Sequence, residues 1–109
     1  MHELAVTQEI VAAAARRAAG GRVSRVVVEI GRLSAVLPDA VRFCFDLCAE
    51  GTALEGAVLE IERPPGRARC RACAAHVELV RPFGRCACGS SDLEWLSGEE
   101  LNLKKVEVR

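Results

Sequence analysis

Six cysteines constrain this chain of 109 residues more than any other feature of its sequence. Four of them form two close pairs, Cys70 with Cys73 and Cys86 with Cys88. Four thiolates in two pairs, each on a tight turn, can converge on one zinc ion with Zn–S distances of about 2.3 Å. Few large apolar side chains surround the pairs, so a metal ion would supply the folding free energy that a small core lacks. The pairs therefore predict a closed, structural zinc site in an insert over residues 67–97. Free, reduced cysteines on turns are the alternative.

The second pair is shorter than the usual Cys-x-x-Cys knuckle, because only Ala87 separates its two cysteines. Gly89 follows and can adopt the positive φ that such a turn needs. The short loop leaves two outcomes open. Both sulfurs bind the metal, or one is poorly placed and His76 replaces it. An exposed strand histidine without a ligand role is the other interpretation of His76.

Cys44 and Cys48 lie four residues apart, on one face of an expected helix. This spacing suits a metal ion. Free cysteine, however, is among the most commonly buried residue types and behaves as a small hydrophobic side chain. The sequence therefore favours a core role for both.

The apolar periodicity predicts two helices and three longer strands. Helical spacing covers residues 4–19, and Pro38 begins a second helix that Gly51 ends. Alternating, β-branched runs predict strands within residues 22–31 and 56–63, and a last strand over residues 101–108. Its apolar phase shifts between Leu103 and Val106, which predicts a bulge or an edge. Two shorter strand-like runs, residues 75–80 and 92–96, each follow a cysteine pair.

This order predicts an α+β fold in which two helices cover one face of a small three-stranded sheet. The expected body comprises residues 1–66 and 98–109, and the zinc-binding insert of residues 67–97 projects from it. Pro64, Pro65 and Gly66 interrupt the strand pattern, so we expect a hinge or boundary there.

The charge balance and the aromatic content indicate which partners the chain is suited to bind. Fifteen Lys and Arg balance fifteen Asp and Glu, which argues against a general polyanion binder. The chain has no Tyr and one Trp, so it offers little for base stacking. A zinc-ribbon nucleic-acid or regulatory module is still the runner-up, because residues 63–88 carry six arginines and one acid, Glu78. Docking of these arginines on an acidic protein surface is preferred, and no nucleic acid is expected.

The remaining sequence features concern the cellular compartment of the protein and whether it is an enzyme. No signal peptide is evident, and the apolar run near residue 15 is too short and too charged to span a bilayer. A cytoplasmic protein without membrane partners is expected, with its thiols reduced. The sequence shows no phosphate loop, Ser/His/acid set or His-Glu-x-x-His motif, so we expect no enzyme.

The chain opens with Met1, His2 and Glu3. The terminal amine, the deprotonated His2 amide and the imidazole can close adjoining five- and six-membered chelate rings. The Glu3 amide or an outside donor would complete a square plane of nitrogens, which suits Ni(II) or Cu(II). A histidine at a helix end without any such role is the alternative.

These features together resemble the HypA family of hydrogenase nickel-insertion proteins. The resemblance rests on "MHE", "EIGRLSAVLPDAVRFCFDLCAEGT", "GAVLEIE", the two cysteine pairs, "CGSSDLE" and "SGEELNLKKVEV", and it covers essentially the whole chain. It implies a nickel metallochaperone that works with the GTPase HypB on the large subunit of [NiFe]-hydrogenase, and in some organisms on urease. The implied nickel residues are Met1, His2 and Glu3, and the implied zinc ligands are the four paired cysteines. The pair Cys86-x-Cys88 departs from the family pattern.

Overall fold

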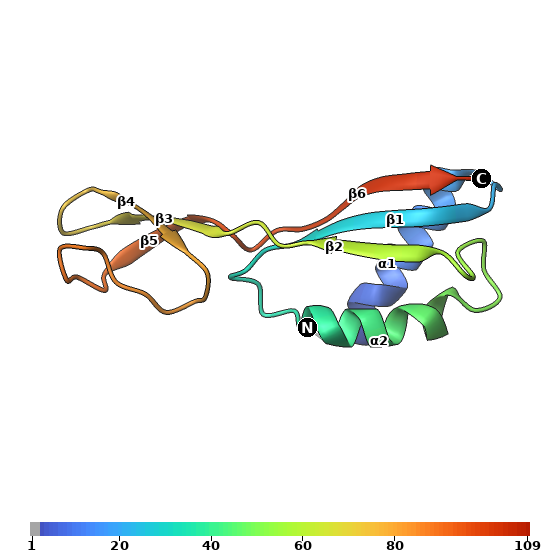
Figure 1. The fold of residues 1–109 in the computed structure, drawn as a ribbon, viewed down its shortest axis with the longest axis horizontal. Coiled ribbons are helices and arrows are strands. Elements are labelled where there is room, and N and C mark those ends of the chain that lie inside the picture. The colour runs from blue at the N-terminus through green and yellow to red at the C-terminus, as the bar shows by residue number, and fades with distance from the viewer. Residues whose placement is uncertain (1–2) are drawn as a thin grey trace.

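The computed structural model describes residues 3–109 and divides them between two sheets (Figure 1). The larger sheet has the strand order β2-β1-β6, with β1 parallel to β2 and antiparallel to β6. Both helices lie on one face of this sheet, which confirms the predicted α+β fold. This part of the molecule contains α1 (Glu3–Ala18), β1 (Val23–Ile30), α2 (Pro38–Ala49), β2 (Val58–Glu62) and β6 (Leu101–Val108).

The core of the body lies between the sheet and the helices. Strand β1 supplies Val26, Val28 and Ile30, all of which are fully buried, and α2 supplies Phe45. The alternation seen in the sequence thus places one set of β1 side chains in the core and the other on the open face of the sheet. Cys48 is half-buried and packs against this core, as expected for a small apolar side chain.

Strand β6 carries the expected irregularity. Val27 is paired with Lys105, but the next residue, Val28, is paired with Leu103. Lys104 is therefore an extra residue in β6, so the predicted bulge between Leu103 and Val106 is confirmed. Strand β6 also forms an edge of the sheet.

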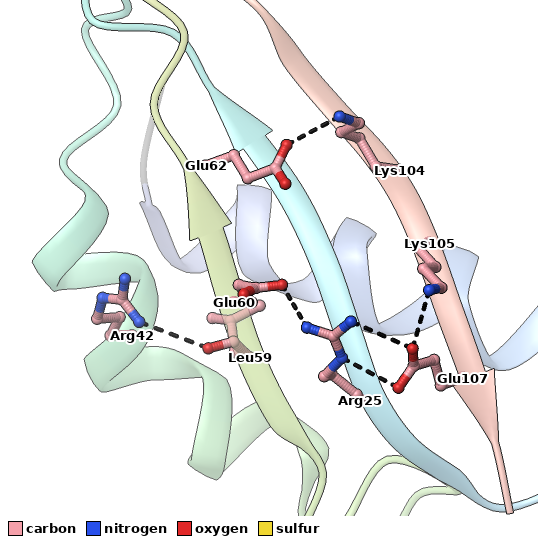
Figure 2. Close-up of polar contacts among 8 residues, drawn as sticks. All are labelled: Arg25, Arg42, Leu59, Glu60, Glu62, Lys104, Lys105 and Glu107. Atoms are coloured by element: carbon pink, nitrogen blue, oxygen red, sulfur yellow. Dashed lines mark hydrogen bonds and ion pairs between the residues drawn. The ribbon is translucent and has the colours of Figure 1, made fainter.

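Charged side chains cover the open face of the sheet (Figure 2). Arg25 on β1 forms ion pairs with Glu60 on β2 and Glu107 on β6. Lys104 lies 2.8 Å from Glu62, so the bulged residue joins β6 to the far strand across β1. These pairs link all three strands, and each is partly exposed to solvent.

The insert forms a second antiparallel sheet, in the order β4-β3-β5. Its strands are β3 (Gly66–Cys70), β4 (His76–Leu79) and β5 (Leu93–Ser97). The sequence predicted β4 and β5 but not β3, whose segment "GRARC" alternates arginine with small residues and lacks β-branched side chains. The insert extends the molecule along its long axis, to overall dimensions of 52 × 21 × 16 Å (Figure 1).

The two sheets are joined through the loop that follows β1. The backbone N–H of Leu33 donates to the carbonyl oxygen of Gly98 at 2.8 Å, and that of Arg32 donates to Pro64 at 3.0 Å. The Leu33 side chain packs with Ala68 and Leu79 in the small apolar cluster of the insert. A Cβ atom at Gly66 would lie 2.4 Å from the Leu33 side chain, so a larger residue at this position would displace Leu33. Gly66, expected at a hinge, thus begins a strand. The predicted division into a body of residues 1–66 and 98–109 and an insert of residues 67–97 is not tested by this arrangement and stays a prediction.

Candidate metal centre

The four paired cysteines come together at the far end of the insert. The Sγ atoms of Cys70 and Cys88 lie 3.7 Å apart, and those of Cys73 and Cys86 lie 3.5 Å apart. All four sulfurs lie within 4.8 Å of one another. A tetrahedral zinc ion with Zn–S bonds of about 2.3 Å requires sulfurs roughly 3.8 Å apart. The cluster therefore fits zinc.

The first pair lies on the turn between β3 and β4. The N–H of Ala74 donates to the carbonyl oxygen of Cys70 at 2.8 Å, and the N–H of Cys70 donates to that of Ala75 at the same distance. Ala74 has a φ of 66°, a left-handed conformation that a residue other than glycine adopts at a cost. This conformation could not be predicted from the sequence, because alanine is not a typical left-handed residue.

The second pair lies on a tighter turn. The N–H of Gly89 donates to the carbonyl oxygen of Cys86 at 2.8 Å, and Cys86 donates to Ser90 at 2.9 Å. Gly89 has the expected positive φ, 94°. This turn brings both Cys86 and Cys88 into the sulfur cluster in spite of the missing residue. Burial differs within each pair, since Cys70 and Cys86 are buried and Cys73 and Cys88 are exposed.

His76 and the helical cysteines lie outside this cluster. His76 is exposed at the start of β4, where it is paired with Arg69 of β3. Cys44 and Cys48 are half-buried on α2, and burial raises the pKa of the Cys48 thiol. Within residues 3–109 the four paired cysteines are the one group of three or more potential ligands whose atoms converge.

The thiols of the cluster differ in acidity. The backbone amide of Cys73 stabilises the Cys70 thiolate and lowers the pKa of Cys70 to about 7. The amide of Ala75 lowers the pKa of Cys73, but hydrogen bonds with the thiols of Cys86, Cys70 and Cys88 outweigh it and raise this pKa to about 12. Four crowded thiolates repel one another, so a divalent cation is what allows all of them to be deprotonated together.

The expected nickel residues are described only in part. Met1 and His2 lie outside the described residues. Glu3 begins α1, and its carboxylate accepts a hydrogen bond from the backbone N–H of Leu37 at 3.1 Å. Leu37 directly precedes α2, so Glu3 fixes the start of α1 beside the start of α2. Neither helix of residues 3–109 is long and apolar enough to cross a membrane.

A small α+β body that carries four converging cysteine sulfurs defines the class of metal-binding proteins. The chain belongs to the HypA family, since the family model described as "Hydrogenase/urease nickel incorporation, metallochaperone, hypA" matches residues 1–108. This family is one of metallochaperones, so the expectation that the chain is not an enzyme is confirmed.

Individual relatives agree with the family. The "Hydrogenase maturation factor HypA" of Nostoc sp. is 56% identical over 108 residues, which cover 99% of this chain and 96% of that protein. The protein of the same name from Geobacter metallireducens is 47% identical over 109 residues, 99% of each chain. The solution structure of the Ni metallochaperone HypA from Helicobacter pylori matches with a TM-score of 0.68 at 25% identity, over 99% of this chain and 97% of that one.

Proposed function

We propose that this protein binds Ni(II) at its N-terminus and delivers it during the maturation of [NiFe]-hydrogenase. The observation that carries the proposal is the combination of the family match over residues 1–108 with Met1-His2-Glu3 at the start of the chain. The terminal amine, the His2 amide and the imidazole supply three nitrogens in the square-planar geometry that Ni(II) favours. The Glu3 amide or an outside donor is the fourth.

The position of Glu3 supports a defined site. Its carboxylate is held by the N–H of Leu37, so residue 3 is anchored to the body just after the proposed chelate. The cluster of Cys70, Cys73, Cys86 and Cys88 holds a structural Zn(II) in this proposal. With four protein ligands the zinc has no open position for chemistry, so the two metals have separate roles.

The proposed partners are the proteins that nickel delivery requires. A HypB-like GTPase is the nickel-insertion partner, and the hydrogenase large subunit is the recipient. Transfer takes place in the cytoplasm, where the zinc thiolates stay reduced. Release requires only moderate nickel affinity, and Cu(II) competes at such a site by the Irving–Williams order.

The test compares two tagged forms of the zinc-loaded protein by calorimetric titration with Ni(II). A histidine-free tag at the C-terminus should leave binding intact, whereas residues added before Met1 convert the amine to a peptide nitrogen and should abolish it. His2→Ala should also abolish binding, and His76→Ala is the matched control, because the chain has two histidines. Binding should weaken as the pH falls through about 6.5, where protons compete for the imidazole. Equal affinities of the two tagged forms would refute the N-terminal site.

A further inference from the structure

The surface of the insert has a hollow beside the cysteine cluster. It has a volume of about 510 Å³, within the usual range of roughly 300–1,000 Å³ for binding pockets. The loop after β4 contributes Pro82, Phe83 and Arg85, and β5 contributes Leu93 and Trp95. None of these residues belongs to the proposed nickel or zinc sites, so the hollow has no role in the function proposed above.

Two aromatic side chains of the hollow are exposed. Phe83 is 86% exposed and Trp95 is 40% exposed. The chain has only four aromatic residues, three Phe and one Trp, so half of them line this hollow instead of a core. Large aromatic side chains left in water at a concave site are typical of protein–protein contacts, where Trp, Phe and Arg are enriched.

Within residues 3–109, no ion pair neutralises the positive charge at the hollow. Arg85 lines the hollow, and Arg81 directly precedes Pro82; neither forms an ion pair with any residue of the range 3–109. To residues 3–109, Arg85 makes one hydrogen bond, from Nη1 to the carbonyl oxygen of Gly89 at 3.0 Å. Its remaining N–H groups are free to bind a carboxylate.

The other arginines of the insert, Arg67, Arg69 and Arg71, do not line the hollow. Arg71 forms an ion pair with Asp92 at 3.0 Å. Arg67 lies opposite Glu78 in the register of β3 and β4, and Arg69 lies opposite Glu94 in that of β3 and β5, but neither arginine forms an ion pair within residues 3–109. Side chains alternate along β3, so Arg67 and Arg69 lie on the opposite face from Ala68, whose β5 partner is Trp95. Arg67 and Arg69 thus lie on the other face of the sheet from Trp95, so they do not form one continuous track with Arg81 and Arg85 of the kind that a nucleic-acid backbone requires.

We propose that this hollow binds a short acidic segment of a partner protein. An apolar side chain of that segment inserts between Phe83 and Trp95, and flanking carboxylates bind Arg85 and Arg81. The cysteine cluster maintains the shape of the hollow, because Arg85 directly precedes Cys86 and Leu93 is paired with Cys70. The insert is thus a recognition module that the metal holds in shape, and this role does not depend on nickel binding at Met1.

The probe is a random peptide library, displayed on phage and selected on the zinc-loaded full chain immobilised at its C-terminus. Enriched peptides should carry Asp or Glu on both sides of a large apolar residue. Synthetic copies should then change the fluorescence of Trp95, which is the only tryptophan of the chain and lies in the hollow. An empty selection, or enrichment of basic peptides, would overturn the proposal.

Substitutions connect the binding to the hollow. Phe83→Ala and Arg81→Ala should each weaken peptide binding on the order of tenfold or more, as expected for anchor residues of an interface. Phe43→Ala is the matched control, because Phe43 is 76% exposed on α2, outside the insert. Zinc content and the helical circular dichroism signal verify that each variant is folded.

Three results would count against an acidic partner. They are unchanged affinity in Phe83→Ala, displacement of the peptide by an equimolar single-stranded DNA oligonucleotide, and Trp95 quenching that follows self-association instead of peptide. The peptides should bind His2→Ala as tightly as the parent chain, so a failure of the nickel proposal is distinguishable from a failure of this one.

Discussion

The body and the insert are stabilised by different means. Within residues 3–109, the main apolar cluster of the body contains fifteen buried residues from both helices, the sheet and the adjoining loops, whereas that of the insert contains three, Leu33, Ala68 and Leu79. One of these three, Leu33, comes from the loop after β1 of the body. A buried aliphatic side chain contributes about 1.5–3 kcal/mol, and ordering each residue costs about 1–2 kcal/mol. Burial can therefore stabilise the body, whereas the insert has too few buried apolar side chains to be stable by burial alone.

The chain provides a separate reporter for each region. Both helices of residues 3–109 lie in the body, so the helical circular dichroism signal follows the body. Trp95 is the only tryptophan and lies on β5, so its fluorescence follows the insert. The comparison can then be tested by perturbing one region and observing both.

Zinc removal should have the largest effect. Structural zinc sites contribute about 10–16 kcal/mol of apparent binding free energy at neutral pH. Chelation, or Cys70→Ser, should therefore abolish the hydrogen-exchange protection of β3, β4 and β5 and shift Trp95 emission to the red. The helical signal should persist, because the body has its own core. Cys44→Ser on α2 is the control and should keep its zinc. Loss of the helical signal upon chelation would mean that the two regions unfold as one unit.

A core substitution in the body should give the reverse pattern. Phe45 is 2% exposed, and Phe45→Ala should destabilise the body by about 3–5 kcal/mol through the lost burial and the remaining cavity. The helical melting temperature should fall, while zinc content at room temperature stays at one ion per chain. Phe43 lies two residues away on the same helix and is exposed, so Phe43→Ala should change stability by only about 0.5 kcal/mol or less. Equal effects of the two substitutions would show that α2 does not pack as described.

The sequence predicted the body more completely than the insert, for a physical reason. Alternating valines identify β1, and the apolar stripe of α2 identifies its buried face, because burial is recorded locally in these patterns. Strand β3 has no such pattern. Its inward residues are small, and it is a strand because β4 and β5 pair with it on both sides. The packing of Leu33 into the insert was missed too, since a contact between distant segments leaves no local signal.

The metal residues show the same contrast. Pairing of cysteines predicted the cluster, and the turn at Gly89 explains how the short pair Cys86-x-Cys88 brings both sulfurs into it. The role of His76 as a replacement ligand stays a prediction, as does nickel binding at Met1 and His2. Zinc-edge absorption spectra of Cys86→Ser and Cys88→Ser, with and without His76→Ala, test whether His76 replaces a missing cysteine ligand.

Leu33→Ala tests the contact between the body and the insert. Leu33 is 3% exposed, and its side chain packs against the insert. Its replacement by Ala should therefore lower the stability of the insert by about 2–3 kcal/mol. Zinc should transfer to a competing chelator faster, and the helical melting temperature should change little. Leu37 belongs to the same loop but is 62% exposed, so Leu37→Ala is the matched control. An unchanged rate of zinc transfer in Leu33→Ala would mean that the body does not support the insert.

The smallest effect concerns the charged face of the body sheet. Hydrogen bonds from Arg25, and then from Lys105, lower the pKa of Glu107 from its ordinary 4.5 to about 2. Because the folded-state pKa is depressed, the stabilisation is complete above about pH 4.5 and is lost as the pH falls toward 2. These groups are solvent-exposed, so screening keeps the contribution small.

Glu107→Gln should therefore lower the helical melting temperature slightly at pH 7, and the difference from the parent chain should vanish as the pH falls from about 4.5 to 2. Added salt should shrink the difference at pH 7 as well. Glu50→Gln is the control, because Glu50 is exposed just after α2 and forms no ion pair within residues 3–109. Since the helical signal belongs to the body, acid release of zinc from the insert does not obscure the result. A difference that persists unchanged at pH 2 would mean that the Arg25–Glu107 pair does not stabilise the body.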